Sequence, residues 1–316
     1  MKIAIIGTGG VGGFFGAKLA KAGHEVTFLA RGRHLQAMQT NGLSVKSIKG
    51  DFKLDKVTAT DSIKAIGPTD LMMVCVKAWQ VKETAAELAA IVSPDTLILP
   101  MQNGVLATEE LAAHLPEKNI LGGLCRIISK IDAPGVINHF GVEPTIIFGE
   151  LDNTQSDRAK QLQATFEQAG IQTKLADDIQ AELWKKFISI CVSGLLAVTR
   201  SNYRQVLELP QTKQLLEDVL TEVYTLSQRI GITIEPDFVA KAIATFKSLP
   251  PESTASLTRD VWEGKPSEIE YQNGTVVKLA EKYNVPVPAN RFIYYSILPM
   301  EKRARKPVYT HEPAHL

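Results

Sequence analysis

The sequence contains few cysteines, and this shortage excludes two kinds of site. Only Cys75, Cys125 and Cys191 occur in 316 residues, and they lie far apart among apolar neighbours. Such spacing provides neither a disulfide framework nor a cluster of metal ligands. We therefore expect reduced core thiols in a cytoplasmic protein, and no metal site.

Net charge and long apolar runs are also missing, which excludes two kinds of partner. Lys and Arg number 35 against 34 Asp and Glu, a formal net charge of +1, so nothing predicts binding to nucleic acid or to an anionic membrane. No apolar run approaches the ~20 residues that a transmembrane helix needs. The first strand-like segment begins at once, so we expect no signal peptide. The length and the 45% hydrophobic content suit a globular protein of two domains.

Glycine, in contrast, is concentrated near the start of the chain. The apolar run Ile3 to Ile6 predicts a strand, and Gly7, Gly9 and Gly12 follow with the spacing G-x-G-x-x-G before an amphipathic segment. A second strand is predicted from Glu25 to Ala30. This order of strand, turn, helix and strand is the context that a dinucleotide-binding motif requires, and it disfavours an ordinary glycine turn.

Each glycine of the motif has its own physical role. Gly7 permits the sharp turn, Gly9 lets a pyrophosphate approach the backbone, and Gly12 allows the helix to pack closely on the strand. The free N–H groups of the helix N-terminus favour the same anion. The predicted cofactor-binding turn comprises Gly7, Thr8, Gly9, Gly10, Val11 and Gly12.

The end of the second predicted strand indicates which dinucleotide is bound. An Asp or Glu usually holds a free ribose 2′-hydroxyl at this point, but here Ala30 is followed by Arg31, Gly32, Arg33 and His34. A cationic group at this position matches a 2′-phosphate. Arg31 therefore predicts NADP(H), with Arg33 or His34 as helpers, and a solvated loop charge is the alternative.

Two further predicted strands end in polar residues. Asp70 leads into a buried strand that ends at Val76 and is followed by Lys77 to Gln80, and the strand Thr96 to Leu99 is followed by Pro100 to Gly104. Open α/β sheets bind ligands at the carboxyl ends of their strands. We therefore expect both polar segments at the binding edge of one sheet.

The periodicity of apolar residues changes after about residue 176. Before it we predict a strand pair within 42–58, strands within 120–149, a helix over 156–169 and a strand over 172–175. Beyond it the period is helical. The predicted fold is α/β, with an NADP-binding Rossmann domain at 1–176 and a mainly α-helical substrate domain at 177–316. Helices are predicted over 179–197, 212–230, 237–246, 269–283 and 291–300, followed by a loosely packed tail from Lys302 to Leu316.

Several short motifs together resemble the ketopantoate reductase family over nearly the whole chain. They are the glycine turn, Arg31, VKAWQ at 76–80, QNG at 102–104, LWKKF at 183–187, and SLTRD…SEIEYQNG at 256–274. The resemblance implies a Rossmann domain, a helical domain and an active site in the cleft between them. It also implies NADPH-dependent reduction of 2-dehydropantoate, a 2-keto acid, to (R)-pantoate in pantothenate and coenzyme A biosynthesis.

The resemblance also assigns catalytic roles to two residues. The general-acid lysine falls on Lys186 and the catalytic glutamate on Glu268, which it also places at the cofactor, whereas Glu270 is expected to be a solvated or capping carboxylate. On a helical wheel Lys186 flanks the buried face and Lys185 points further toward solvent. Without the resemblance, either lysine would be read as an ordinary surface charge.

Other positions carry cofactor and substrate contacts by the same resemblance. Lys77 matches the family's cofactor-contacting lysine, and Asn103 matches the asparagine that positions the nicotinamide or the catalytic lysine. Ser256 matches, within one residue, the serine segment that holds the substrate carboxylate. In the substrate site, Ile190 and Gly194 replace two asparagines that the family commonly has four and eight residues after the lysine.

The loss of those two amides leaves the substrate open. A reductase of another branched 2-keto acid remains an alternative, and so does an NADPH-binding sensor without catalysis. Retention of both Lys186 and Glu268 argues against a sensor, which needs no proton donor. The only partner expected is a small 2-keto acid, and the protein is expected to be a monomer or a homodimer.

Overall fold

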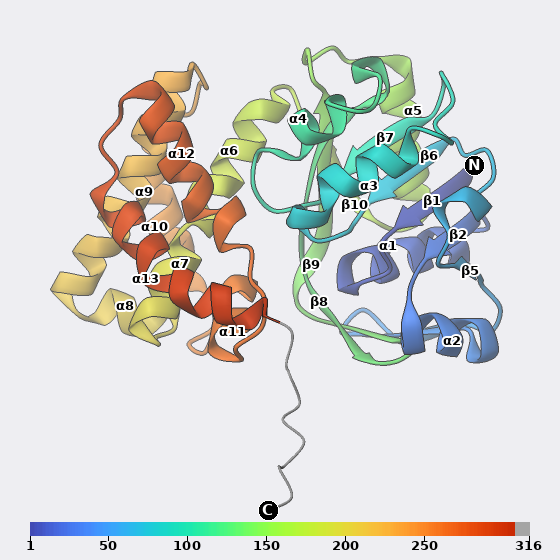
Figure 1. Ribbon diagram of the computed structural model, residues 1–316, viewed down its shortest axis with the longest axis horizontal. Helices are drawn as coiled ribbons and strands as arrows, with labels where there is room; N and C mark the ends of the chain where they lie inside the picture. Colours follow the sequence, from blue (N-terminus) through green and yellow to red (C-terminus); the bar gives the residue numbers. More distant parts are fainter. Residues whose placement is uncertain (307–316) are drawn as a thin grey trace, which may run out of the picture. The chain divides into compact units, whose positions relative to one another are not determined.

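The computed structural model describes residues 1–306, which form two compact units (Figure 1). Unit 1 comprises Met1–Leu183 and unit 2 begins at Trp184, so the division falls within helix α6 (Ile179–Ile190). Unit 1 is built on a parallel sheet with helices, and unit 2 is helical. The predicted fold class is confirmed.

The central sheet of unit 1 has five parallel strands in the order β5-β2-β1-β6-β7. The order reverses between β1 and β6, which makes that point the topological switch where doubly wound sheets bind their ligands. The strands are β1 (Lys2–Ile6), β2 (Glu25–Leu29), β5 (Thr58–Thr60), β6 (Leu71–Val74) and β7 (Leu97–Pro100).

Alternate residues of β1 point into two separate cores, as the period of a strand requires. Ile3 and Ile5 pack with α1 and α5, whereas Ala4 and Ile6 pack with α3 and α4 on the other face. The sheet is therefore buried on both faces, which explains the unbroken apolar run in the sequence. The helices are α1 (Gly10–Lys21), α2 (Gly32–Asn41), α3 (Val81–Leu88), α4 (Ala107–Ala112) and α5 (Asp157–Gln168), with short 3₁₀ turns η1 (Ile63–Ala65), η2 (Ala78–Gln80) and η3 (Glu117–Asn119).

A second sheet in unit 1 accounts for the strands that the sequence predicts within 42–58, 120–149 and 172–175. The long strands β8 (Leu121–Ala133) and β9 (Val136–Glu150) form an antiparallel hairpin. Strand β9 also pairs with β10 (Gln172–Leu175) and β3 (Leu43–Ser47), and β3 pairs with β4 (Phe52–Leu54). This sheet packs against α1, so α1 lies between the two sheets.

Unit 2 departs from the predicted helices in four places. The segment predicted as one helix over 179–197 is interrupted at Cys191, the segment over 269–283 begins with a 3₁₀ turn, and two short helices, α8 and α11, were not predicted. The elements are α6, α7 (Val192–Thr199), α8 (Tyr203–Glu208), α9 (Pro210–Ile230), α10 (Phe238–Ser248), α11 (Ser256–Trp262), η4 (Ile269–Tyr271), α12 (Asn273–Tyr283) and α13 (Pro288–Ala304).

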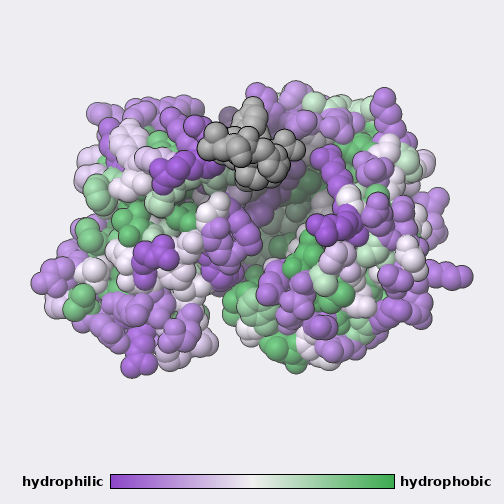
Figure 2. Space-filling model, turned by 60° about the horizontal axis from the view of Figure 1, so that its bottom comes forward, coloured by the Kyte–Doolittle hydropathy of each residue, from purple (hydrophilic) through white to green (hydrophobic). Residues whose placement is uncertain are grey.

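Helix α13 is the last helix that the structure describes. Helix α13 continues to Ala304, past the predicted start of the tail at Lys302, and residues 307–316 of that tail lie outside the described residues. Within residues 1–306 no helix is long and apolar enough to cross a membrane. On the face that Figure 2 shows, hydrophilic residues are spread over each unit and hydrophobic ones form smaller groups among them.

Candidate functional site

The glycine turn of unit 1 has the backbone that its sequence predicts. Gly7 has φ +105°, which L side chains rarely adopt, and a methyl group on it would lie 2.8 Å from the backbone nitrogen of Val76. A methyl group on Gly12 would collide with the carbonyl oxygen of Gly7. At Gly9, in contrast, a methyl group would meet nothing within 4 Å. The turn is thus closed on its protein side and open at Gly9, where a pyrophosphate needs space.

The N-terminus of α1 follows this turn directly. Gly9 is the N-cap and offers no side-chain hydrogen bond, so the first N–H groups of the helix receive none from their cap. Thr8 is 5% exposed, and both its backbone N–H and its hydroxyl donate to the carbonyl of Leu29 at 2.9 Å. This fixes the turn against the end of β2. The geometry fits a dinucleotide pyrophosphate.

The segment that follows β2 carries two exposed arginines and one half-buried imidazole. Arg31 is exposed, is the N-cap of α2 and forms no ion pair within residues 1–306. His34 is half-buried and its Nδ1 accepts from the backbone N–H of Gly135 at 3.1 Å. Burial lowers the pKa of His34, and the nearby backbone of Thr8 opposes this only in part. His34 is therefore neutral at pH 7, which favours Arg31 and the exposed Arg33 as groups for a 2′-phosphate.

The polar segments after β6 and β7 are fastened to each other by a buried glutamine. The amide Nε2 of Gln102 donates to the carbonyls of Val74 at 2.9 Å and Val76 at 3.0 Å. This holds the two strand ends together and places Lys77 and Asn103 in adjacent loops at the switch-point edge. No role was predicted for Gln102, although an amide directly after a buried strand is the signal that could have revealed it.

In unit 2, the two lysines of α6 differ in their surroundings. The ammonium of Lys185 pairs with Glu235 at 2.8 Å, and this contact is the main cause that lowers the pKa of Glu235. Lys185 and Lys186 are both half-buried, and the expectation that Lys185 points further toward solvent stays a prediction. The predicted buried face, including Leu183 and Phe187, is confirmed.

Glu268 lies on a backbone that the end of α13 holds in place. Its side chain is 6% exposed, and the preceding Ser267 is fully buried. The backbone N–H and the hydroxyl of Ser267 donate to Glu301 Oε2 at 2.9 and 2.6 Å. Arg305 donates to Glu301 and, at 3.0 Å, to the carbonyl of Ser267. Neither Glu301 nor Arg305 was singled out in the sequence, where they form only an ordinary i,i+4 pair.

Glu270 is not the solvated or capping carboxylate that the sequence suggested. Its Oε1 accepts from the Tyr294 hydroxyl at 2.6 Å, and its Oε2 pairs with Lys278 at 3.1 Å. Burial, and then the hydrogen bond to Glu270, raise the pKa of Tyr294. Glu270 therefore serves to join α12 and α13.

Glu301→Ala should destabilise the protein by about 2–6 kcal/mol, because it leaves two buried donors of Ser267 without an acceptor, at ~1–3 kcal/mol each. Urea unfolding followed by tryptophan fluorescence measures the change. Glu281→Ala is the matched control, since Glu281 is exposed and lies 3.5 Å from Arg291, and its effect should stay within ~0.5 kcal/mol. Equal effects of the two substitutions would contradict this role of Glu301.

A buried amide network explains the interruption at Cys191. The Nδ2 of Asn273 donates to the Cys191 carbonyl at 3.0 Å and to Asn290 Oδ1 at 2.9 Å, and Asn290 Nδ2 donates to Glu222 at 2.8 Å. Asn273 Oδ1 is buried without a hydrogen bond. A methyl group on Gly194 would lie 2.6 Å from that oxygen. The missing side chain at 194 is what lets Asn273 reach the helix junction.

Gly194→Ala should therefore destabilise unit 2 even though alanine is the better helix former. The added methyl would also lie 2.5 Å from Ile293 Cγ2, and overpacking of this kind costs about 1–3 kcal/mol. Thermal unfolding of this variant is compared with that of Gly67→Ala, where a methyl meets nothing within 4 Å. A Gly194 variant as stable as the control would show that the packing is less tight than described.

The remaining predicted substrate residues also lie in unit 2. Ile190 is half-buried as the last residue of α6, and Ser256 is exposed as the first residue of α11. Buried hydrogen bonds connect the elements around them: the Ser193 hydroxyl donates to Gln272 at 2.7 Å, and the Gln272 N–H donates to the Glu268 carbonyl at 3.0 Å. The helix junction after Lys186 and the turn that carries Glu268 are thus linked within one unit.

The predicted residues fall in both units, and Asn103, also predicted to contact substrate, and Glu268, also predicted to contact the cofactor, lie in different units. The cofactor residues of the glycine turn, Arg31, Lys77 and Asn103 lie in unit 1, and Lys186, Glu268, Ile190, Gly194 and Ser256 lie in unit 2. A doubly wound sheet with this glycine turn, followed by a helical unit, defines a class of dinucleotide-dependent oxidoreductases.

Comparison with known proteins identifies the family within that class. The family model described as ketopantoate reductase PanE/ApbA matches residues 3–153, and its C-terminal model matches residues 178–301. The chain belongs to the ketopantoate reductase family. It is 32% identical to a 2-dehydropantoate 2-reductase of Nostoc sp., over 96% of each chain.

Solved structures agree with this assignment. A 2-dehydropantoate 2-reductase from Geobacter metallireducens matches with a TM-score of 0.88 and 29% identity, covering 96% of this chain and 100% of that one. A D-mandelate dehydrogenase bound to NADH and anilino(oxo)acetate also has a TM-score of 0.88, at 21% identity over 97% of this chain and all of that one. The second likeness shows only that the two proteins share the fold.

Proposed function

We propose that this protein reduces 2-dehydropantoate to (R)-pantoate with NADPH, as a cytoplasmic enzyme of pantothenate and coenzyme A biosynthesis. The observation that carries the proposal is the retention of Lys186 and Glu268 on linked elements of a unit whose family acts on this substrate. The Nostoc relative, which is named for the same reaction, supports it.

Residues of unit 1 fit the cofactor. The turn that opens at Gly9 and the N-terminus of α1 would hold the pyrophosphate, and Arg31 would pair with the 2′-phosphate. Lys77 and Asn103 would hold the nicotinamide half from the adjacent loops after β6 and β7. When bound, NADPH supplies the hydride for the keto carbon.

Lys186 is proposed as the general acid. Negative charge builds on the keto oxygen during reduction, and an ammonium group at hydrogen-bonding distance stabilises that charge and then donates a proton to the oxygen. The resemblance assigns this role to Lys186 and not to Lys185, whose ammonium pairs with Glu235 at 2.8 Å.

Glu268 is proposed to orient the Lys186 ammonium and to accept a hydrogen bond from the new hydroxyl. A carboxylate can do this only if its backbone is fixed, and Ser267, Glu301 and Arg305 fix it. Ser256 is proposed to bind the substrate carboxylate from the start of α11. The precise geometry of the acid therefore depends on the end of α13.

A second candidate function, favoured by Ile190, is reduction of another branched 2-keto acid. Asparagine at this position could hydrogen-bond ketopantoate. Isoleucine presents an apolar wall instead, so a keto acid that lacks the hydroxyl should lose less binding free energy here than it would beside an asparagine. Because Asn273 occupies the space beside Gly194, an asparagine at 194 could not be restored without displacement, and Ile190 is the position that can be tested.

Ile190→Asn should shift the ratio of kcat/KM for ketopantoate over 2-ketoisovalerate toward ketopantoate by about three- to tenfold, the worth of one neutral hydrogen bond of ~0.5–1.5 kcal/mol. Steady-state kinetics of both forms give the ratio, and Ile190→Val, which keeps an apolar wall, should leave it unchanged. If the unmutated protein strongly prefers ketopantoate and the asparagine variant does not improve on it, another residue supplies the contact.

The non-catalytic alternative is tested by separating binding from turnover. NADPH binding is measured by its fluorescence, and NADPH oxidation by absorbance, in the presence of ketopantoate, 2-ketoisovalerate, pyruvate and phenylglyoxylate. A reductase should both bind NADPH and oxidise it in the presence of at least one of these acids. Tight NADPH binding with no oxidation by any of these acids would instead support a sensor.

A further inference from the structure

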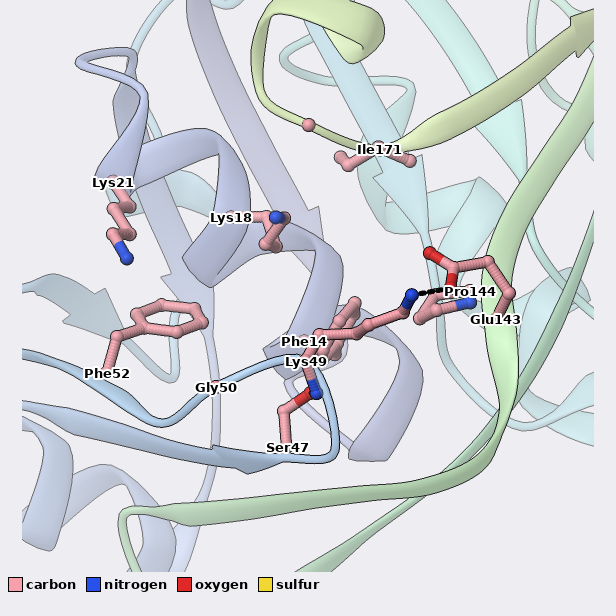
Figure 3. A pocket seen from close by; sticks show the side chains of 11 residues that line it. Phe14, Lys18, Lys21, Ser47, Lys49, Gly50, Phe52, Glu143, Pro144 and Ile171 are labelled. Carbon is pink, nitrogen blue, oxygen red and sulfur yellow. Dashed lines mark hydrogen bonds and ion pairs between the residues drawn. The ribbon is translucent and has the colours of Figure 1, made fainter.

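A pocket of about 260 Å³ lies in unit 1, beside the C-terminal half of α1 (Figure 3). Lys18 and Lys21 enter it from α1, and Ser47, Lys49 and Phe52 enter from the β3–β4 hairpin that faces the helix. The remaining lining residues are Phe14, Gly50, Glu143, Pro144, Gly170 and Ile171. None of these residues has a role in the proposed reaction.

The pocket carries an excess of positive charge. Three lysines line it and only one carboxylate, Glu143, which forms an ion pair with Lys49. Within residues 1–306, neither Lys18 nor Lys21 forms an ion pair or donates a hydrogen bond. The Lys21 ammonium instead lies over the Phe52 ring, 4.6 Å from its centroid. Neither ammonium group is thus paired with an anion among the described residues, although the charge of Glu143 in the same pocket partly opposes the lowering of the Lys18 pKa.

Lys18 is the more informative of the two because it is partly buried. Burial is the main cause that lowers its pKa, and the charge of Lys21 lowers it further. Basic residues in the last turn of a helix are favourable for the helix dipole, which accounts for lysines at this end of α1. It does not account for an ammonium that is drawn into a pocket against Gly170 and gains no acceptor there. A bound anion would supply that acceptor.

The rest of the lining is mixed, with Ser47 and two glycines beside the apolar side chains of Phe14, Phe52 and Ile171. Phe14 is 3% exposed and its ring lies 4.8 Å from the ring of His139, which also hydrogen-bonds Ser47 at 2.8 Å. This contact fixes Phe14 as a rigid wall. Phe52 and Ile171 add further apolar surface. The pocket therefore combines three lysines with a smaller apolar wall, to which Phe14, Phe52 and Ile171 contribute.

We propose that this pocket binds a small organic phosphate that carries a flat apolar group. Lysine ammonium groups are common phosphate ligands, and Lys18 and Lys21 would offset the two phosphate charges. The volume is slightly below the ~300–1,000 Å³ of pockets for drug-sized ligands, so an aryl phosphate about the size of phenyl phosphate fits best.

The pocket is separate from the proposed cofactor site. Lys18 lies eight residues after Gly10, at which α1 begins, and a rise of 1.5 Å per residue puts the two about 12 Å apart along the helix. The cofactor turn lies at the N-terminus of α1 and this pocket lies toward its C-terminus. Occupancy of one site therefore leaves the other available.

Calorimetric titrations of the full chain with phenyl phosphate, without NADPH and with saturating NADPH, test the proposal. We expect binding, and we expect Lys18→Gln to raise the Kd about tenfold because it removes a charge-assisted hydrogen bond. Lys160→Gln on α5, an exposed lysine outside the pocket, should leave the Kd unchanged. The NADPH affinity of all three proteins should be equal.

Three outcomes would overturn the proposal. The first is binding that occurs without NADPH and disappears with it, which would assign phenyl phosphate to the cofactor turn. The second is an equal Kd for the Lys18 and Lys160 variants. The third is no binding at all. Inorganic phosphate and benzyl alcohol are titrated as well. Each should bind at least tenfold more weakly than phenyl phosphate. Inorganic phosphate that bound as tightly would contradict the need for a ring, and benzyl alcohol that bound as tightly would contradict the need for a phosphate.

Discussion

Lys186→Ala should lower kcat by about 10²–10⁴-fold, the contribution that general acid catalysis typically makes. The variant loses the ammonium that is proposed to protonate the keto oxygen, while the glycine turn and Arg31 of unit 1 are untouched. The Kd for NADPH should therefore stay the same. Stopped-flow reduction of ketopantoate and fluorescence titration with NADPH measure the two quantities separately.

Lys185→Ala is the matched control, because Lys185 lies next to Lys186 on the same helix and is also half-buried. Its pair with Glu235 is partly exposed, and pairs of this kind contribute only ~0–1 kcal/mol to stability. We expect kcat within about twofold of the unmutated protein, an effect worth less than 1 kcal/mol. If Lys185 proved to be the sensitive residue, the assignment along α6 would be wrong by one position.

Arg31→Ala should raise the KM for NADPH at least about tenfold and leave the KM for NADH nearly unchanged, because only the 2′-phosphate would lose a charge-assisted contact of ~1.5–3 kcal/mol. Arg31 is exposed, so its removal should not affect folding. The unmutated protein should accordingly prefer NADPH. Steady-state kinetics with each cofactor provide all four values.

Lys64→Ala is the control for charge alone, since it removes one exposed cation of unit 1 outside the cofactor turn. It should change neither KM. Equal use of NADPH and NADH by the unmutated protein would contradict the role of Arg31, whatever the variants show.

The parts of the fold that the sequence predicts well are those that local interactions determine. The run Ile3 to Ile6 and the turn at Gly7 specify a buried strand and a tight turn within a few residues, and both are observed. The second sheet is different. Its strand β3 pairs with β9, about ninety residues later, and no local pattern in either strand identifies its partner.

The candidate site shows the same limit. The helix predicted over 179–197 is interrupted because Asn273, distant in sequence, bonds the Cys191 carbonyl. The buried acceptor of Ser267 is Glu301, which in the sequence looks like a surface residue of a charged helix end. The local periodicity of apolar residues reveals which residues face a core. It does not reveal which distant polar group a buried side chain contacts there.

The most direct test of the account is the kcat/KM of the unmutated protein for ketopantoate with NADPH, measured beside the same quantity for 2-ketoisovalerate, pyruvate and phenylglyoxylate. The account predicts that ketopantoate has the highest value and that the product is (R)-pantoate. A higher kcat/KM for any other acid of the panel would contradict it and would make the protein a reductase of that acid.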